Sequence, residues 1–169
     1  MTKTNAARLL DQMGIAYRVL EYAIGDEHLD AVQVAALVGL APESVFKTLV
    51  ARGDQHGHCM AIVPGPATLD LRALARASGD RSVALIALKG VTPLTGYVRG
   101  GVTALAAKKA FPVYLDESAL AFSEIAVSAG KKGLQLLLRP QDYVAATHAK
   151  VASLVIGTTV RTTGSETDS

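Results

Sequence analysis

The sequence has little cysteine, few aromatic residues and no long apolar run. Cys59 is the single cysteine among 169 residues, so no disulfide can form within the chain and a reducing compartment fits. Five Tyr, three Phe and no Trp argue against a module that binds single strands by stacking many bases. Apolar stretches such as 83–88 are strand-sized, well short of the ~18 residues that a membrane span needs. The sequence therefore predicts no membrane association.

Charge is also scarce, and it is uneven. Charged residues make up 19% of the chain and the formal net charge is +2, whereas half of the residues are apolar; a disordered chain has the opposite balance. Residues 1–54 hold five Lys or Arg against seven Asp or Glu, and residues 89–139 hold seven against three. The second segment is either a solvated face or a contact surface for a phosphate or an RNA backbone. The small net charge and the lack of a helix-turn-helix predict no specific DNA binding.

The length predicts one domain. We expect this domain to span residues 1–156, followed by a polar, Thr/Ser-rich tail at 157–169. The first residues lack the apolar segment of a secretion signal, and the acidic Asp11 follows soon after. We therefore expect a cytoplasmic protein.

Helix and strand signals alternate along the chain. Capping residues and closing glycines predict helices at 4–14, 31–38, 68–79 and 140–148, with a helical turn near Pro93. Alternating or apolar runs between turn residues predict strands at 15–22, 45–52, 58–63, 82–87, 96–103, 112–116, 125–128 and 134–138. Strands outnumber helices and hairpins recur. The predicted fold class is α+β, a single domain with a curled, mixed, largely antiparallel central sheet flanked by helices.

No standard catalytic signature is present. The chain has no Gly-x-Ser-x-Gly elbow, Walker loop or His-Glu-x-x-His helix,. His56, His58 and Cys59 lie near one turn, but a closed zinc site needs four ligands and no second cluster stands nearby. Cys59 itself lies in an apolar strand, where cysteine usually behaves as a small buried hydrophobe. We therefore expect no metal and no cofactor.

Three features outline a pocket without identifying its ligand. Lys47 lies within an apolar strand, either on a solvated face, which the pattern slightly favours, or in a pocket, where its ammonium would bind an anion such as phosphate. Gly100 and Gly101 are costly in a strand unless a bulge forms or another group approaches the backbone closely. Residues 128–133 form either a plain hairpin turn or a nest of backbone N–H groups for an anion or carbonyl.

Four segments, in order, resemble the YbaK family, free-standing relatives of the editing domain inserted in bacterial prolyl-tRNA synthetase. They are Val45-Phe-Lys-Thr-Leu-Val50, residues 95–105, Lys108-Lys109 with Pro112 and Asp116, and residues 127–134. The resemblance covers about Asn5 to His148. It implies an α+β domain that acts in trans on the 3′ acceptor end of aminoacyl-tRNA and removes a mischarged amino acid, most often cysteine or alanine, from tRNA for proline. Prolyl-tRNA synthetase is a further candidate partner.

The resemblance also implies site residues. Lys47 takes the place of the family's essential lysine, expected at the terminal phosphate or ribose. The implied substrate-binding residues are Tyr22, Thr48, Gly100, Gly101, Thr103, Ser128, Gly130 and Gln135. This chain departs from the family at Thr103, Ala104 and Ala106, which replace Ser, Pro and Gly, and at Gln135, where Asp is usual.

The resemblance explains the missing hydrolase signature. In cysteine-removing members the thiol of the substrate attacks its own ester, while the protein supplies position and backbone N–H donors. In alanine-removing members a water attacks instead. Two alternatives to a Cys-tRNA(Pro) deacylase stay open: a deacylase for alanine or another small amino acid, and a non-catalytic protein that binds a nucleotide or aminoacyl-adenosine.

Overall fold

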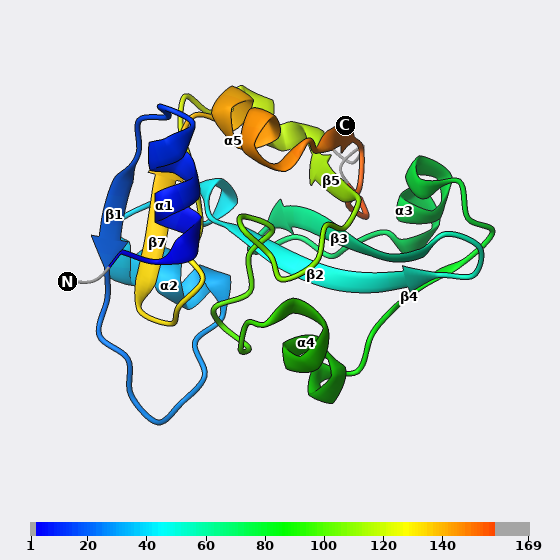
Figure 1. Ribbon diagram of the computed structural model, residues 1–169, viewed down its shortest axis with the longest axis horizontal. Coiled ribbons are helices and arrows are strands. Elements are labelled where there is room, and N and C mark those ends of the chain that lie inside the picture. The colour runs from blue at the N-terminus through cyan, green and yellow to red at the C-terminus, as the bar shows by residue number, and fades with distance from the viewer. Residues whose placement is uncertain (1–2, 158–169) are drawn as a thin grey trace, which may run out of the picture.

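The computed structural model describes residues 3–157 (Figure 1). Its elements, in chain order, are α1 (Asn5–Gln12), β1 (Arg18–Glu21), α2 (Ala31–Val38), the 3-10 turn η1 (Pro42–Ser44), β2 (Phe46–Gly53), β3 (Gly57–Pro64), α3 (Leu71–Ser78), β4 (Val83–Leu85), α4 (Leu88–Thr95), β5 (Val113–Asp116), the 3-10 turn η2 (Glu117–Ala121), β6 (Ile125–Ser128), β7 (Leu134–Leu138), α5 (Pro140–Thr147) and β8 (Lys150–Ala152).

The strands form two open sheets. One has the order β1-β7-β6 and is antiparallel throughout; the other has the order β4-β2-β3-β5-β8. In the second sheet the antiparallel hairpin β2–β3 is extended by β5 and β8, which run parallel to their neighbours. A single parallel bridge between Val45 and Ala126 joins the sheets. The predicted α+β class with mixed, largely antiparallel pairing is confirmed, although the strands divide between two sheets.

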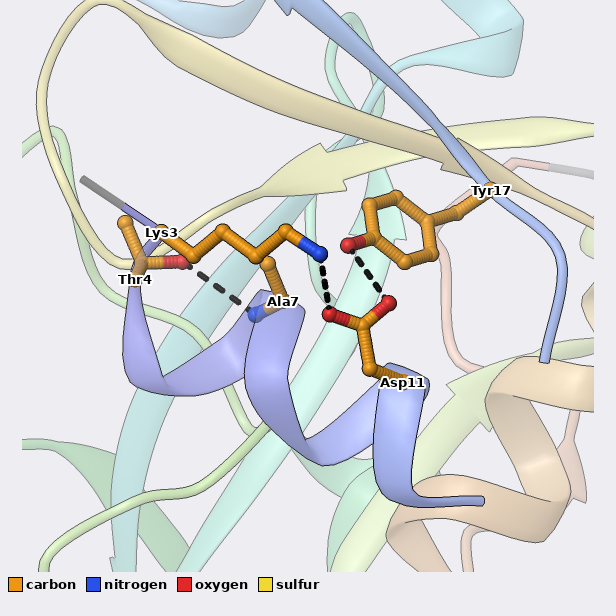
Figure 2. Close-up of polar contacts among 5 residues, drawn as sticks. All are labelled: Lys3, Thr4, Ala7, Asp11 and Tyr17. Atoms are coloured by element: carbon orange, nitrogen blue, oxygen red, sulfur yellow. Dashed lines mark hydrogen bonds and ion pairs between the residues drawn. The ribbon is translucent and has the colours of Figure 1, made fainter. Parts of the chain in front are cut away.

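The helices begin and end where the local sequence signals place them. Asp30 caps α2 through a reciprocal pair of hydrogen bonds with Gln33, and Gly39 ends the helix with a left-handed φ of 75°,. Thr4 caps α1 with a single hydrogen bond, since its hydroxyl accepts from Ala7 N. Figure 2 shows how the far end of α1 is tied down: Asp11 accepts from Lys3 Nζ at 2.6 Å and from the Tyr17 hydroxyl at 2.9 Å.

Strand β3 lies between two hydrophobic cores. Met60 and Ile62 point into the larger core, which both sheets share, and Ala61 and Val63 point into a smaller one beneath α3. All four are fully buried. This double burial is why the strand reads as a continuous apolar run in the sequence rather than as an alternating one.

The expected strand at 96–103 is wrong. Gly96 ends α4 with a φ of 82°, and Gly100 has a φ of 88°, so the chain turns twice where a strand would stay extended,. Gly101 N donates to Val98 O within the second turn. The helical turn expected near Pro93 is the two-turn helix α4, which Figure 1 shows below the β2–β3 hairpin. Strand β8 carried no sequence signal that we recognised.

The predicted domain limits at 156 and 157 stay a prediction. Described residues up to Ile156 are tied to the domain, because Leu154 N donates to Asp116 Oδ1 and Ile156 N donates to Thr68 O, both at 2.9 Å. Most of the predicted tail, 158–169, lies outside the described residues. Within 3–157, no helix has the length and hydropathy required to cross a membrane.

Candidate functional site

A cavity of about 350 Å³ lies along an open edge of β2. Strand β4 pairs with β2 only at residues 51–53, so the edge from Phe46 to Leu49 has no neighbouring strand on that side. The loop before α2, helix α4, the loop after it and the ends of β6 and β7 close the space instead. Since Val50 O accepts from Ile86 N on this edge, strand alternation directs the backbone N–H and C=O of Thr48 to the same side. The volume suits a small ligand.

Lys47 is half-buried and lines this cavity. Its ammonium donates to the carbonyl oxygens of Gly65 at 3.0 Å and Ala67 at 2.8 Å, in the turn that follows β3. An ammonium has three N–H groups, so one remains for a ligand. Burial lowers the pKa of Lys47, and the carboxylate of Asp30 opposes that shift. The question left open by the strand pattern is thereby answered: Lys47 is in the pocket.

The position of Lys47 depends on close packing between the turn after β3 and helix α2. A Cβ at Gly65 would lie 2.8 Å from Ala31 Cβ, so only glycine lets the two segments approach this closely. Asp30 stands next to Ala31 and also lines the cavity. Its Oδ1 accepts from Gln33 N at 2.8 Å. Asp30 therefore serves both as the cap of α2 and as an acidic group on the wall that Lys47 faces.

Three polar side chains from different strands line the cavity. Thr48 comes from β2, Ser128 from the end of β6, and Gln135 from β7, where it pairs with Ser128. Thr48 Oγ1 and Gln135 Oε1 are buried and have no hydrogen-bond partner in the described part of the protein. A buried polar atom without a partner costs about 1–3 kcal/mol. Such a cost is recovered when a ligand supplies the missing hydrogen bonds.

Two loops pack against each other behind the opening. A Cβ at Gly101 would lie 3.2 Å from the backbone of Lys131, and a Cβ at Gly130 would lie 2.9 Å from the Tyr97 ring. Ser128 Oγ accepts from Gly130 N at 3.1 Å. Tyr22 N donates to Gly133 O at 2.9 Å and joins the first loop to the same turn. Gly101 therefore serves a close approach of backbones, one of the two interpretations that the sequence allowed, whereas Gly100 turns the chain with a φ of 88°.

The positions at which this chain departs from the family pattern, Thr103 and Ala106, have local structural consequences. Thr103 is fully buried, and its hydroxyl accepts from Leu105 N at 3.3 Å. A hydroxyl is therefore still available where the family has serine. Ala106 has a φ of 52°, which glycine adopts without strain and alanine does not,. The Tyr97 hydroxyl lies within hydrogen-bond distance of the Leu105 and Ala106 carbonyl oxygens, at 2.8 and 2.9 Å, and holds this segment in place.

The model of the aminoacyl-tRNA editing domain family matches residues 27–146. The chain belongs to this family. It is 41% identical over 152 residues, covering 90% of this chain and 93% of the relative, to a candidate Cys-tRNA(Pro)/Cys-tRNA(Cys) deacylase, EbsC, from Enterococcus faecalis. The solved structure of a candidate trans-editing enzyme for prolyl-tRNA synthetase superposes with a TM-score of 0.80 at 28% identity, covering 93% of this chain and 100% of that one. A hypothetical protein superposes equally well, with a TM-score of 0.80 at 24% identity over 89% and 99% of the two chains, which supports the fold.

The editing-domain cavity gathers most of the residues that the sequence singled out. Tyr22, Lys47, Thr48, Gly100, Ser128 and Gln135 line it. Gly101, Thr103 and Gly130 do not; they shape the loops behind it. Sequence reasoning missed His28, Asp30 and Arg99 as lining residues. Asp30 was recognised only as a helix cap, and Arg99 lies inside a segment that carries the family resemblance, which is the signal that could have found it.

The cavity of this editing domain contains no cysteine. Cys59 lies in the smaller core with 3% exposure, and burial, with a contribution from Asp80, raises its pKa to about 11. The thiol therefore stays protonated at neutral pH and is a poor nucleophile. His58 packs edge-on against Phe111. Among residues 3–157, no three His, Cys, Asp or Glu side chains gather as a metal site would require.

Proposed function

We propose that this protein is a trans-editing deacylase that releases the amino acid from mischarged tRNA, with Cys-tRNA(Pro) as its substrate. The observation that carries the proposal is the cavity itself, which is lined by the half-buried Lys47 ammonium and by two buried polar atoms, Thr48 Oγ1 and Gln135 Oε1, that have no partner among the described residues. Membership of the editing family and the names of EbsC and of the solved prolyl-tRNA trans-editing relative give the substrate class. Such a substrate is made in the cytoplasm, which is the compartment we propose.

The polar groups have separate roles in this proposal. The free N–H of Lys47 holds an oxygen of the terminal ribose. Gln135 Oε1 accepts from the α-ammonium of the amino acid, and Thr48 Oγ1 bonds the same aminoacyl group. Gln135 is neutral where the family usually has a carboxylate, so this site recognises the ammonium by a hydrogen bond without a countercharge.

The amino acid then leaves without a protein nucleophile. The cysteine thiol of the substrate attacks its own ester carbon; a sulfur–carbon bond forms, the carbon–oxygen bond to the ribose breaks, and the thiol proton passes to the departing ribose oxygen. Water later opens the resulting thiolactone. Orientation of the two reacting groups is worth about 7–11 kcal/mol, and each backbone N–H on the developing oxyanion about 3–4 kcal/mol. Ser128 lines the cavity in this scheme, and its hydroxyl accepts from Gly130 N.

Amino-acid release from a panel of charged tRNAs tests the proposal. Cys-tRNA(Pro), Ala-tRNA(Pro) and Pro-tRNA(Pro) are incubated with excess protein, and the remaining ester is measured over time. We expect rapid loss of cysteine and none of proline. Loss of alanine alone would move the assignment to the alanine-removing class, and binding without release from any substrate would favour a non-catalytic binding protein. Faster release in the presence of prolyl-tRNA synthetase would support that enzyme as a partner.

A further inference from the structure

Three basic side chains from three separate loops meet at the mouth of the cavity. His28 precedes α2, Arg99 follows α4, and Lys132 lies in the turn between β6 and β7. A Cβ at Gly100 would lie 3.4 Å from Lys132 Cγ and 3.6 Å from His28 Cε1, so both side chains rest against this glycine. His28, Arg99 and Gly100 all line the opening. We call His28, Arg99 and Lys132 the basic rim.

Within residues 3–157, no ion pair neutralises the charges of Arg99 and Lys132. The ion pairs found within residues 3–157 all lie elsewhere, and the three rim side chains are exposed. Asp30 is the acid that acts on His28, and its carboxylate already caps α2. The other carboxylates of the same loop, Asp26 and Glu27, are exposed. Like charges held together in this way favour an anionic ligand.

We propose that the basic rim binds the RNA phosphodiester that precedes the terminal adenosine of the substrate. This inference rests on the proposed function, in which the adenosine and its amino acid occupy the cavity beside Lys47. The next phosphate along the RNA then lies at the opening, where Arg99 offers a fork of N–H donors and Lys132 a mobile ammonium. The rim contacts only backbone, so it adds affinity for any RNA end and no base specificity.

Binding at the rim is coupled to a proton on His28. Partial burial, together with the charges of Arg99 and Lys132, lowers the pKa of His28 in the free protein, so its ring is largely neutral at pH 7. A bound phosphodiester favours the imidazolium form and raises that pKa. The extra affinity is therefore complete below the pKa of free His28 and is lost as the pH rises through the pKa of the bound form.

The test uses the trinucleotide CCA, which ends tRNA, and adenosine, which carries no phosphate. Binding of both to the full chain is measured across a salt series for the wild type, for R99Q/K132Q and for the control R81Q/K150Q. Arg81 and Lys150 are exposed and lie outside the cavity. The control variant therefore removes the same amount of positive charge as R99Q/K132Q. We expect R99Q/K132Q to weaken CCA binding about tenfold and to lower the slope of log K against log salt by about 0.7, the value for one phosphate contact on a single strand. Adenosine binding and the control variant should not change.

The pKa of His28, measured by NMR with H28N for assignment, should rise when CCA binds and stay the same with adenosine. Equal losses of CCA affinity in R99Q/K132Q and R81Q/K150Q would refute the proposal that the basic rim binds the phosphodiester. An unchanged His28 pKa on CCA binding would refute it as well. These results do not depend on catalysis. If the protein binds CCA through the basic rim but releases no amino acid, the proposed function is refuted and the role of the basic rim is still supported.

Discussion

Replacing Lys47 by methionine removes the ammonium from the cavity and keeps most of the apolar stem. In the folded protein two charge-assisted hydrogen bonds are lost, to Gly65 O and Ala67 O. Both carbonyls belong to partly exposed residues, so water can replace the ammonium. We expect the free energy of unfolding to fall by about 1–2 kcal/mol, which lowers Tm by about 2–8 °C in a chain of this size.

The effect on catalysis should be larger. If the third N–H of Lys47 holds the substrate in the transition state, its loss costs about 3–4 kcal/mol, or about 10²–10³-fold in kcat/KM. The assay is single-turnover loss of the Cys-tRNA(Pro) ester at a temperature well below the Tm of the variant. Circular dichroism confirms that the variant is folded.

Lys150→Met is the matched control, because Lys150 is an exposed lysine of β8 outside the cavity. It should retain the wild-type rate. A folded Lys47→Met protein within about twofold of wild type would refute the role given to Lys47 and with it the assignment of the site.

Four further results are expected. Gln135→Leu removes a buried acceptor that has no partner among residues 3–157, so it should raise the free energy of unfolding by about 1 kcal/mol while lowering kcat/KM at least about tenfold. A variant as active as wild type would show that Gln135 does not contact substrate. Tyr143→Phe removes another buried hydroxyl without a partner in the described residues, and denaturant unfolding should show a gain of about 1 kcal/mol, with a loss contradicting the burial argument. Gly101→Ala brings a Cβ within 3.2 Å of the Lys131 backbone, so it should destabilise by about 1–3 kcal/mol and slow deacylation. Cys59→Ser should keep wild-type activity, and because the Cys59 thiol is buried with a pKa of about 11, native protein should resist alkylation at pH 8 until it is unfolded.

The parts of the fold that the sequence predicted well are those with local causes. Asp30 and Gly39 define α2 through capping and a left-handed terminus, and the turn at 53–57 joins β2 to β3 in the expected hairpin. By contrast, alternation at 96–103 gave a strand that does not exist. Alternation alone cannot show whether a partner strand is present, and here the segment packs on Lys131 and Gly130 instead.

The candidate site was predictable only as far as the family resemblance reached. Strand alternation could not place Lys47, because the cavity exists where β4 stops pairing with β2, and that end point is a property of the whole sheet. His28 and Lys132 are brought together by Gly100 across three loops. Contacts between loops distant in sequence leave no periodic signal, so the basic rim appeared only in the structure.

The rate of ester cleavage in Cys-tRNA(Pro) compared with Ser-tRNA(Pro), under single-turnover conditions, tests the central claim most directly. Serine has nearly the same shape as cysteine but is a far weaker nucleophile at neutral pH. If the substrate's own group is the nucleophile and the cavity only orients it and stabilises the oxyanion, cysteine should be released rapidly and serine far more slowly. Equal release of the two would contradict the account, because it would require a nucleophile or activated water supplied by the protein.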